Sequence, residues 1–295
     1  MIDDRNGAIV ASPLPVVKLA AFTNLACPLD GLRLRADAGC WRCAADHHFD
    51  VAREGYVHLL PVQHKRSRDP GDSKAMVAAR RRFLDAGHYA PIAAAVCTSL
   101  LAGAHTEEPL RCLDAGCGEG YYLRHLAQAT MSRALELIGL DISKWAVKAA
   151  ARRHTDITWV VASNARLPIP AESLDRVLCL FGFPAPHEFA RVLRSGGEVL
   201  LADPGPAHLR ELREVIYPCL KAPGTESLQV PAEFQALPGD RLNTQLHLGS
   251  AQAIADLLVM TPHHYRAGAE GRAAASALGH LDVTLDVRLT RWRRL

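Results

Sequence analysis

The feature that most constrains the fold is a glycine-rich loop between a strand and a helix. Residues 110–114 form a short apolar run that predicts a buried strand, and residues 122–129 have the composition of a helix. Between them lies the run Asp114-Ala115-Gly116-Cys117-Gly118-Glu119-Gly120. Glycines at such a junction let the backbone turn sharply and approach a ligand in front of the helix N-terminus. The loop therefore predicts a site for a nucleotide-like ligand.

Strand-like and helix-like segments alternate through most of the chain. Strands are expected at 135–140, 157–161, 174–181 and 197–202, and helices at 92–101 and 144–153. This alternation predicts an α/β fold with a doubly wound, mostly parallel, Rossmann-like sheet. From Val283 to Leu289 apolar and polar residues alternate, which predicts a half-buried antiparallel strand that closes the sheet.

The composition excludes several classes of protein. The chain has 295 residues, 49% of them hydrophobic and 22% charged, which suits a globular protein with one large domain and a small appendage. No apolar run approaches the roughly 18 residues of a membrane span, and no signal-peptide cleavage site stands out. Eight cysteines in a chain of this size do not indicate a disulfide scaffold, so a cytoplasmic location is expected. A net charge of +3 leaves any argument for nucleic-acid binding to the local distribution of charge.

The spacing of the glycines narrows the choice of ligand. Asp141 follows Gly120 by 21 residues, at the end of the next strand, where an acidic side chain can bind ribose hydroxyls. The pattern is G-x-G-x-G rather than the G-x-G-x-x-G of dinucleotide sites, and Asp114 suits a cationic amino-acid moiety. The loop thus resembles the first motif of S-adenosylmethionine-dependent methyltransferases. A nicotinamide site and a tight turn without a ligand are the alternatives. The residues expected at the cofactor are Asp114, Gly116, Gly118, Gly120 and Asp141.

Residues 27–60 carry a cluster of cysteines and histidines. Zinc is commonly bound by four N, S or O ligands from two close-spaced pairs. Cys27, Cys43 and His47 are three candidate ligands, and either Asp30 or Cys40 is the fourth. The alternative is that reduced cysteines simply pack a small domain.

Residues 61–90 form a polar connector that is rich in basic side chains. Between residues 64 and 82, only Asp69 and Asp72 oppose the cations Lys65, Arg66, Arg68, Lys74, Arg80, Arg81 and Arg82. Such a strip can contact RNA phosphates, although runs of charge also occur on ordinary solvated surfaces.

Two phenylalanines follow the predicted strand over residues 174–181. Residues that position the substrate emerge at such carboxyl ends in this type of fold. Phe181 and Phe183 are therefore expected either to stack on a base or to pack in the core.

Several segments closely resemble one family, the bacterial large-subunit (23S) ribosomal RNA guanine-N1 methyltransferases (RlmA-like), which join an N-terminal zinc module to a methyltransferase domain. The likeness covers roughly residues 27–295, and the Leu-Pro-Val-Gln-His-Lys-Arg-Ser run that begins at Leu60 is highly specific. The segments that carry it are 49–57, 59–72, 80–89, 114–122, 204–209 and 261–262.

The resemblance implies roles for individual residues. Tyr89, Gly118, Glu119 and His208 would contact S-adenosylmethionine. Cys27, Cys43 and His47 fall on zinc-ligand positions, whereas Asp30 stands where the family has a second cysteine. Together with the organisation of the chain, four parts are expected. They are a disordered lead-in (1–26), a zinc-binding-like RNA-recognition module (27–60), the basic connector (61–90) and the methyltransferase domain (91–295). The connector is expected to bind RNA through Lys65, Arg66, Arg68 and Arg80–Arg82.

The implied activity is methyl transfer to N1 of a guanine in a hairpin of 23S rRNA. N1 lies on the Watson–Crick edge, so the target base must be unpaired or flipped out. His187, Asp203 and His208 are the candidates for the base that accepts the N1 proton. A homodimer is expected by analogy with the family. A small-molecule methyltransferase and an RNA-binding protein with a decayed cofactor site are the rival functions.

Overall fold

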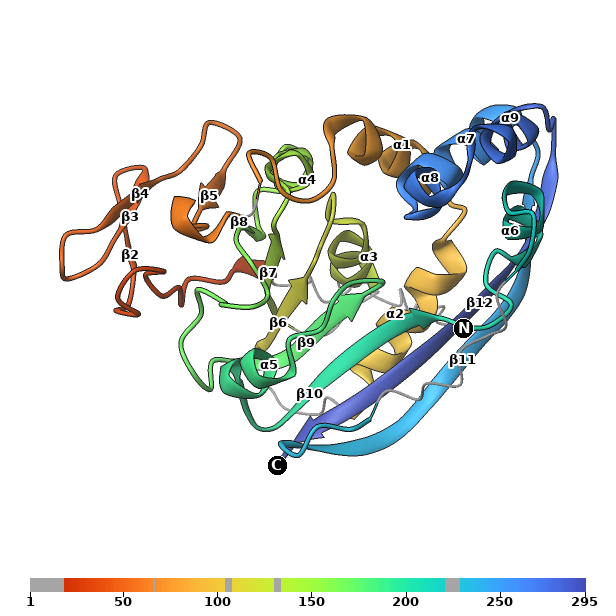
Figure 1. Cartoon of the computed structure of the whole chain (residues 1–295). Coiled ribbons are helices and arrows are strands. Elements are labelled where there is room, and N and C mark those ends of the chain that lie inside the picture. Colours follow the sequence, from red (N-terminus) through yellow and green to blue (C-terminus); the bar gives the residue numbers. More distant parts are fainter. Residues whose placement is uncertain (1–18, 66, 104–107, 130–133, 221–228) are drawn as a thin grey trace, which may run out of the picture.

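A computed structural model describes residues 19–65, 67–103, 108–129, 134–220 and 229–295. Within these ranges the main sheet has nine strands, in the order β11-β12-β10-β9-β6-β7-β8-β5, with β1 pairing with β7 (Figure 1). These strands are β1 Leu19–Ala21, β5 Tyr56–His58, β6 Leu110–Ala115, β7 Leu135–Asp141, β8 Thr158–Val161, β9 Leu174–Leu180, β10 Leu193–Pro204, β11 Phe234–Leu248 and β12 Leu281–Arg294. From β10 to β5 all neighbours are parallel, and β12 and β11 are antiparallel.

The predicted doubly wound, mostly parallel α/β sheet is confirmed. The antiparallel strand near the C-terminus is also confirmed as β12, but it does not close the sheet, because β11 pairs with its outer side. The sequence analysis missed β11, since Pro238-Gly239 interrupts it and reads as a turn. The register shifts between Leu237 and Asp240, so this edge strand absorbs the proline in an irregularity.

Helices cover both faces of the sheet. One core packs against α2 and α3, and the other packs against α5 and the segment around Phe22 and Leu25. The helices are α1 Lys74–Asp85, α2 Ala90–Leu101, α3 Tyr121–Ala129, α4 Lys144–Ala151, α5 Pro186–Val192, α6 Arg210–Ile216, α7 Ala251–Met260, α8 His263–Arg266 and α9 Ala269–Ser276, with a 3-10 turn at Val62–His64. Among the described residues, no helix is long and apolar enough to cross a membrane.

The N-terminal boundary differs from the expected one. A disordered lead-in over residues 1–26 is wrong for its last part, because β1 pairs with β7 and the side chains of Phe22 and Leu25 are fully buried. Apolar burial offsets the entropy of ordering this segment. Residues 1–18 lie outside the described part of the chain. Strand β5, from the expected metal module, pairs with β8 in the main sheet.

The rest of the expected metal module forms a small antiparallel sheet. Its strands are β2 Arg35–Asp37, β3 Cys40–Arg42 and β4 His48–Asp50, in the order β2-β3-β4. This sheet lies at the end of the main sheet opposite to β11 and β12 (Figure 1). Cys27, Leu34 and Cys43 belong to the same buried core as residues of β8 and α5, so the module is built onto the larger domain.

The basic connector folds onto the methyltransferase domain. Helix α1 lies beside α7 (Figure 1). Arg82 Nε donates to Asp256 Oδ2 at 3.0 Å, and the Asp256 side chain is only 5% exposed. Because Arg82 neutralises a buried carboxylate of α7, part of the basic character of the connector serves to dock α1.

Candidate cofactor site and metal centre

The glycine loop connects β6 to α3 at the carboxyl edge of the parallel strands. Gly120 has φ +81°, and a Cβ at this position would lie 2.5 Å from the Trp159 ring. Only glycine fits, because both the backbone conformation and the space exclude a side chain. The indole of Trp159 thereby packs directly beneath the loop, and its Nε1 donates to the carbonyl of His154 at 2.8 Å.

Asp114, at the start of the glycine loop, has a buried carboxylate without hydrogen-bond partners among the described residues. The residue is 1% exposed, and neither carboxylate oxygen has a hydrogen-bond partner among the described residues. Burial, and to a smaller extent the charge of Asp141, raises the pKa of Asp114 to about 8. A buried acceptor without a partner is costly. The two unpartnered oxygens of Asp114 therefore fit a ligand that brings a cationic donor, such as the ammonium of S-adenosylmethionine.

Asp141 stands at the end of β7, as expected from its spacing. Its carboxylate accepts hydrogen bonds from the backbone amides of Gly118 at 3.0 Å and Ser143 at 2.8 Å. Burial raises the pKa of Asp141, and these two hydrogen bonds oppose that effect. Asp141 therefore holds the glycine loop against the start of α4, beside the place where a ribose would bind.

Glu119 is placed differently from Asp114. Its fully buried carboxylate pairs with Arg124, with the two contacts of Nη1 and Nη2 at 2.9 and 3.0 Å, and with Arg153 at 3.5 Å. Any contact of Glu119 with a cofactor would therefore use its backbone, and its side chain stabilises the loop.

The rings of three expected site residues, Tyr89, Phe181 and His208, lie close together. The ring of Phe181 lies 5.9 Å from that of His208 and 6.3 Å from that of Tyr89. Phe181 has φ +54°, an unusual conformation for a residue with a side chain, and Phe183 is 92% exposed. The left-handed backbone at Phe181 turns the chain at the end of β9. Of the two expectations for these phenylalanines, packing in the core is contradicted, because Phe181 is also exposed, at 38%.

The three candidate bases have very different surroundings. His187 is exposed at the start of α5 and pairs with Glu233. His208 is buried and accepts a hydrogen bond from the amide of Asp286 at Nδ1, and burial lowers its pKa to about 4. Asp203 lies near the end of β10, and its buried Oδ2 has no hydrogen-bond partner among the described residues. Of these three candidates, Asp203 is the one whose carboxylate has an acceptor without a partner among the described residues.

The cysteine and histidine cluster has the geometry of a metal site. The ligand atoms of Cys27, Asp30, Cys43 and His47 all lie within 4.8 Å of one another. His47 Nδ1 is 3.6 Å from Cys27 Sγ, 3.5 Å from Cys43 Sγ and 2.9 Å from Asp30 Oδ2. A tetrahedral zinc ion sets such atoms roughly 3.3–3.8 Å apart, given bonds of about 2.0–2.3 Å. The four residues therefore fit zinc.

The structure decides between the two candidates for the fourth ligand. Asp30 joins the cluster, with Oδ2 at 3.3 Å from Cys43 Sγ. Cys40 lies in β3, opposite Asp37 and Asp50, and is not part of the cluster. The C-x-x-C spacing of Cys40 and Cys43 is thus misleading, because Cys40 is the first residue of β3 and Cys43 follows its last residue.

The predicted basic strip is split in two by the fold. Arg80, Arg81 and Arg82 pair with Asp72, Asp85 and Asp256. Lys65 and Arg68, by contrast, have no ion-pair partner among the described residues, and Arg66 lies outside the described part of the chain. Of the five expected RNA contacts that the structure describes, Lys65 and Arg68 keep a free charge, whereas the three arginines of α1 are paired.

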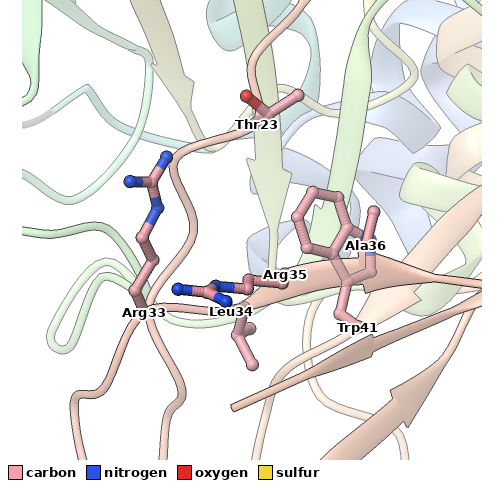
Figure 2. A pocket seen from close by; sticks show the side chains of 6 residues that line it. All are labelled: Thr23, Arg33, Leu34, Arg35, Ala36 and Trp41. Carbon is pink, nitrogen blue, oxygen red and sulfur yellow. The ribbon is translucent and has the colours of Figure 1, made fainter. Parts of the chain in front are cut away.

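The sequence analysis missed a group of residues in the small sheet. An open cavity of about 350 Å³ lies there, and Figure 2 shows the side chains that line it. It is lined by Thr23, Arg33, Leu34, Arg35, Ala36 and Trp41. Arg33 and Arg35 are exposed and have no ion-pair partner within the described ranges. No spacing motif marks these residues, although a tryptophan between two cysteines could have drawn attention to the segment.

Comparisons with known proteins agree with this architecture. Residues 25–68 match the zinc-ribbon family described as "RlmA, N-terminal", and residues 112–203 match the family described as "Methyltransferase domain". The chain is 34% identical over 278 residues to the 23S rRNA (guanine(748)-N(1))-methyltransferase of Streptomyces fradiae, covering 92% of this chain and 97% of that protein.

Two further relatives are provisionally named 23S rRNA (guanine-N(1)-)-methyltransferases. One, from Micromonospora griseorubida, is 34% identical over 92% of this chain and 97% of its own length. The other, from Bacillus subtilis (strain 168), is 28% identical over 90% of this chain and 95% of its own length. The chain therefore belongs to the family of 23S rRNA guanine-N1 methyltransferases, in which an RlmA-type zinc ribbon precedes an S-adenosylmethionine-dependent methyltransferase domain.

Proposed function

We propose that this protein transfers the methyl group of S-adenosylmethionine to N1 of a guanine in a hairpin of 23S rRNA. The observation that carries the proposal is the 34% sequence identity to a 23S rRNA guanine-N1 methyltransferase over 97% of its length, together with the match of the zinc ribbon. The buried Asp114 without a partner supports an intact cofactor site. Action as a homodimer and in the cytoplasm are further proposals that follow the family.

The chemistry requires alignment more than covalent help from the protein. Bound S-adenosylmethionine supplies an electrophilic methyl group on its sulfonium, and the target nitrogen must approach in line with the breaking bond. Asp114 would hold the ammonium of the cofactor, and Asp141 would hold its ribose. The tight packing of Trp159 under Gly120 keeps the loop in one position.

The target guanine must present N1 at the carboxyl edge of the sheet. Phe183 is the most exposed of the large apolar side chains described, and an exposed aromatic ring beside a catalytic edge suits stacking on an unpaired base. Phe181 would line the same place against Tyr89 and His208. We propose that this cluster receives the base.

Asp203 is the residue best suited to accept the N1 proton. Guanine N1 carries a hydrogen at neutral pH, and this proton must leave as the N–CH₃ bond forms. The free Oδ2 of Asp203 can take it, whereas the Nδ1 of His208 is engaged by the amide of Asp286. Ala202, next to Asp203, accepts the backbone hydrogen bond of Phe181 at 2.8 Å, which places Asp203 next to the proposed base site.

The RNA hairpin would be held by the zinc ribbon and by the free part of the connector. Arg33 and Arg35 carry unpaired charge and line the same cavity as the half-buried ring of Trp41, a combination that suits a phosphate and a nearby base (Figure 2). Lys65 and Arg68 add further unpaired charge. We propose these four cations as the main phosphate contacts, in place of the paired arginines of α1.

The reaction product tests the function. The purified protein is incubated with labelled S-adenosylmethionine and 23S rRNA from cells that lack their own guanine-N1 methyltransferase. We expect N1-methylguanosine in nucleoside mass spectrometry. If no RNA is labelled although the cofactor binds, the acceptor is a small molecule and the proposal is wrong. A protein that does not bind the cofactor would instead be an RNA-binding protein.

Replacement of Asp203 tests the general base. Burial raises the pKa of Asp203 above 3.8, against a smaller opposite effect of Arg288, so wild-type activity should fall as the pH drops through this raised value. Asp203→Asn should lower single-turnover rates by about 10²- to 10⁴-fold and remove this acid limb, with cofactor binding unchanged. Asp282→Asn, at an exposed position, is the control. A wild-type pH profile in Asp203→Asn would exclude this role.

The metal content tests the ligand set. We expect about one zinc ion per chain, measured by inductively coupled plasma mass spectrometry, because four donors converge. Asp30→Ala should lose most of the zinc, whereas Cys40→Ala should retain it. The reverse result would show that Cys40, and not Asp30, is the fourth ligand.

The salt dependence of binding tests the RNA contacts. The double variant Arg33→Ala/Arg35→Ala should bind a 23S hairpin more weakly. The negative slope of log K for association against log [salt] should become less steep by about 1 to 2. Arg210→Ala removes an exposed but paired arginine and should behave as wild type. An unchanged slope in the double variant would contradict the proposed contacts.

A further inference from the structure

Arg80 lies against the glycine loop and not among the solvent-facing cations of the connector. Its Nη1 pairs with Asp72, and its Nη2 donates to the carbonyl of Met260 at 3.1 Å. A methyl group added to Gly118 would lie 3.7 Å from Nη1, and the Arg80 side chain is 25% exposed. The guanidinium therefore borders the loop that the cofactor must approach.

The methionine end of S-adenosylmethionine carries two opposite charges. Asp114 can meet the ammonium, but the carboxylate also needs a partner. Several backbone amides of the loop are already used, because Gly116 and Cys117 donate to the carbonyl of Leu140. The amide of Gly118 is used by Asp141, and that of Gly120 donates to Cys117. A cationic side chain beside the loop would add a charged partner for the carboxylate.

The other arginines close to the loop are already committed. Arg124 and Arg153 share the carboxylates of Glu119 and Asp85. Arg80 has five N–H groups, and its two partners among the described residues leave several of them free. Its charge acts on the site, since it lowers the pKa of Asp141 against the larger raising effect of burial.

We propose that Arg80 binds the carboxylate of S-adenosylmethionine, while Asp114 binds its ammonium. Arg80 would then be a cofactor-binding residue, and the RNA contact expected from its place in a basic run is withdrawn. Asp72 and the carbonyl of Met260 hold the guanidinium in place, so the carboxylate meets an already oriented donor. This inference rests on the cofactor part of the proposed function and is independent of the RNA target.

Three ligands that differ in charge separate the two contacts. S-adenosylmethionine has both groups, decarboxylated S-adenosylmethionine keeps only the ammonium, and methylthioadenosine lacks both. Isothermal titration of the full-length protein measures each affinity. Arg80→Ala should weaken S-adenosylmethionine binding by about 10- to 100-fold, as expected for a charged hydrogen-bonded contact, and leave the other two ligands nearly unaffected.

Matched variants distinguish this role from a structural one. Arg81→Ala, at the next and more exposed position, should bind all three ligands as wild type does. Arg80→Lys should recover part of the lost affinity, and Asp114→Asn should weaken both ligands that carry the ammonium. Equal losses for all three ligands in Arg80→Ala, or no loss for any, would overturn the proposal. Because only binding is measured, the result stands even if the methylated product is not N1-methylguanosine.

Discussion

The buried carboxylate of Asp114 is the constraint on which the rest of the site depends. An ionised group without partners is strongly disfavoured in the interior, and here the protein responds by raising its pKa to about 8. Since the folded state then holds a proton that the unfolded chain would release above pH 3.8, this group costs stability increasingly as the pH rises from about 4 to 8. A bound cation would remove that cost. The fold thus carries local instability at the point where a charged cofactor contributes most.

The other charged groups near the loop, unlike Asp114, all have partners. Glu119 forms ion pairs with Arg124 and Arg153, and these contacts hold the loop to α3 and to the end of α4. Asp141 uses its oxygens to hold Gly118 and Ser143. The connector closes over the same edge, because Ser143 Oγ donates to the carbonyl of Asp72 and Arg80 reaches Met260. The segment between the zinc ribbon and the large domain therefore lies against the glycine loop and the start of α4.

Most of the central fold could be predicted from the sequence, and the parts that could not have physical causes. The parallel strands were visible because they are buried on both faces and therefore read as continuous apolar runs. Strand β11 was missed because its exposed alternation and its proline resemble a loop. Residues 19–26 were assigned to a disordered end, since three-residue pairing and two buried side chains leave little pattern in a sequence. In the metal cluster, Cys27, Cys43 and His47 were identified by type and spacing alone.

The sequence by itself determined the alternating parallel strands and helices of the central sheet, the glycine loop, the acidic residues at two strand ends and three candidate metal ligands. These follow from local backbone preferences and from residue chemistry at short spacing. Only the tertiary structure decided between Asp30 and Cys40, committed the Glu119 side chain to Arg124 and separated Arg80 from the free cations of the connector. Those outcomes depend on which groups meet across long stretches of chain, such as Arg80 and Met260 or Arg82 and Asp256. A charge has the same appearance in a sequence whether it is free or neutralised, and only its neighbours in space distinguish the two.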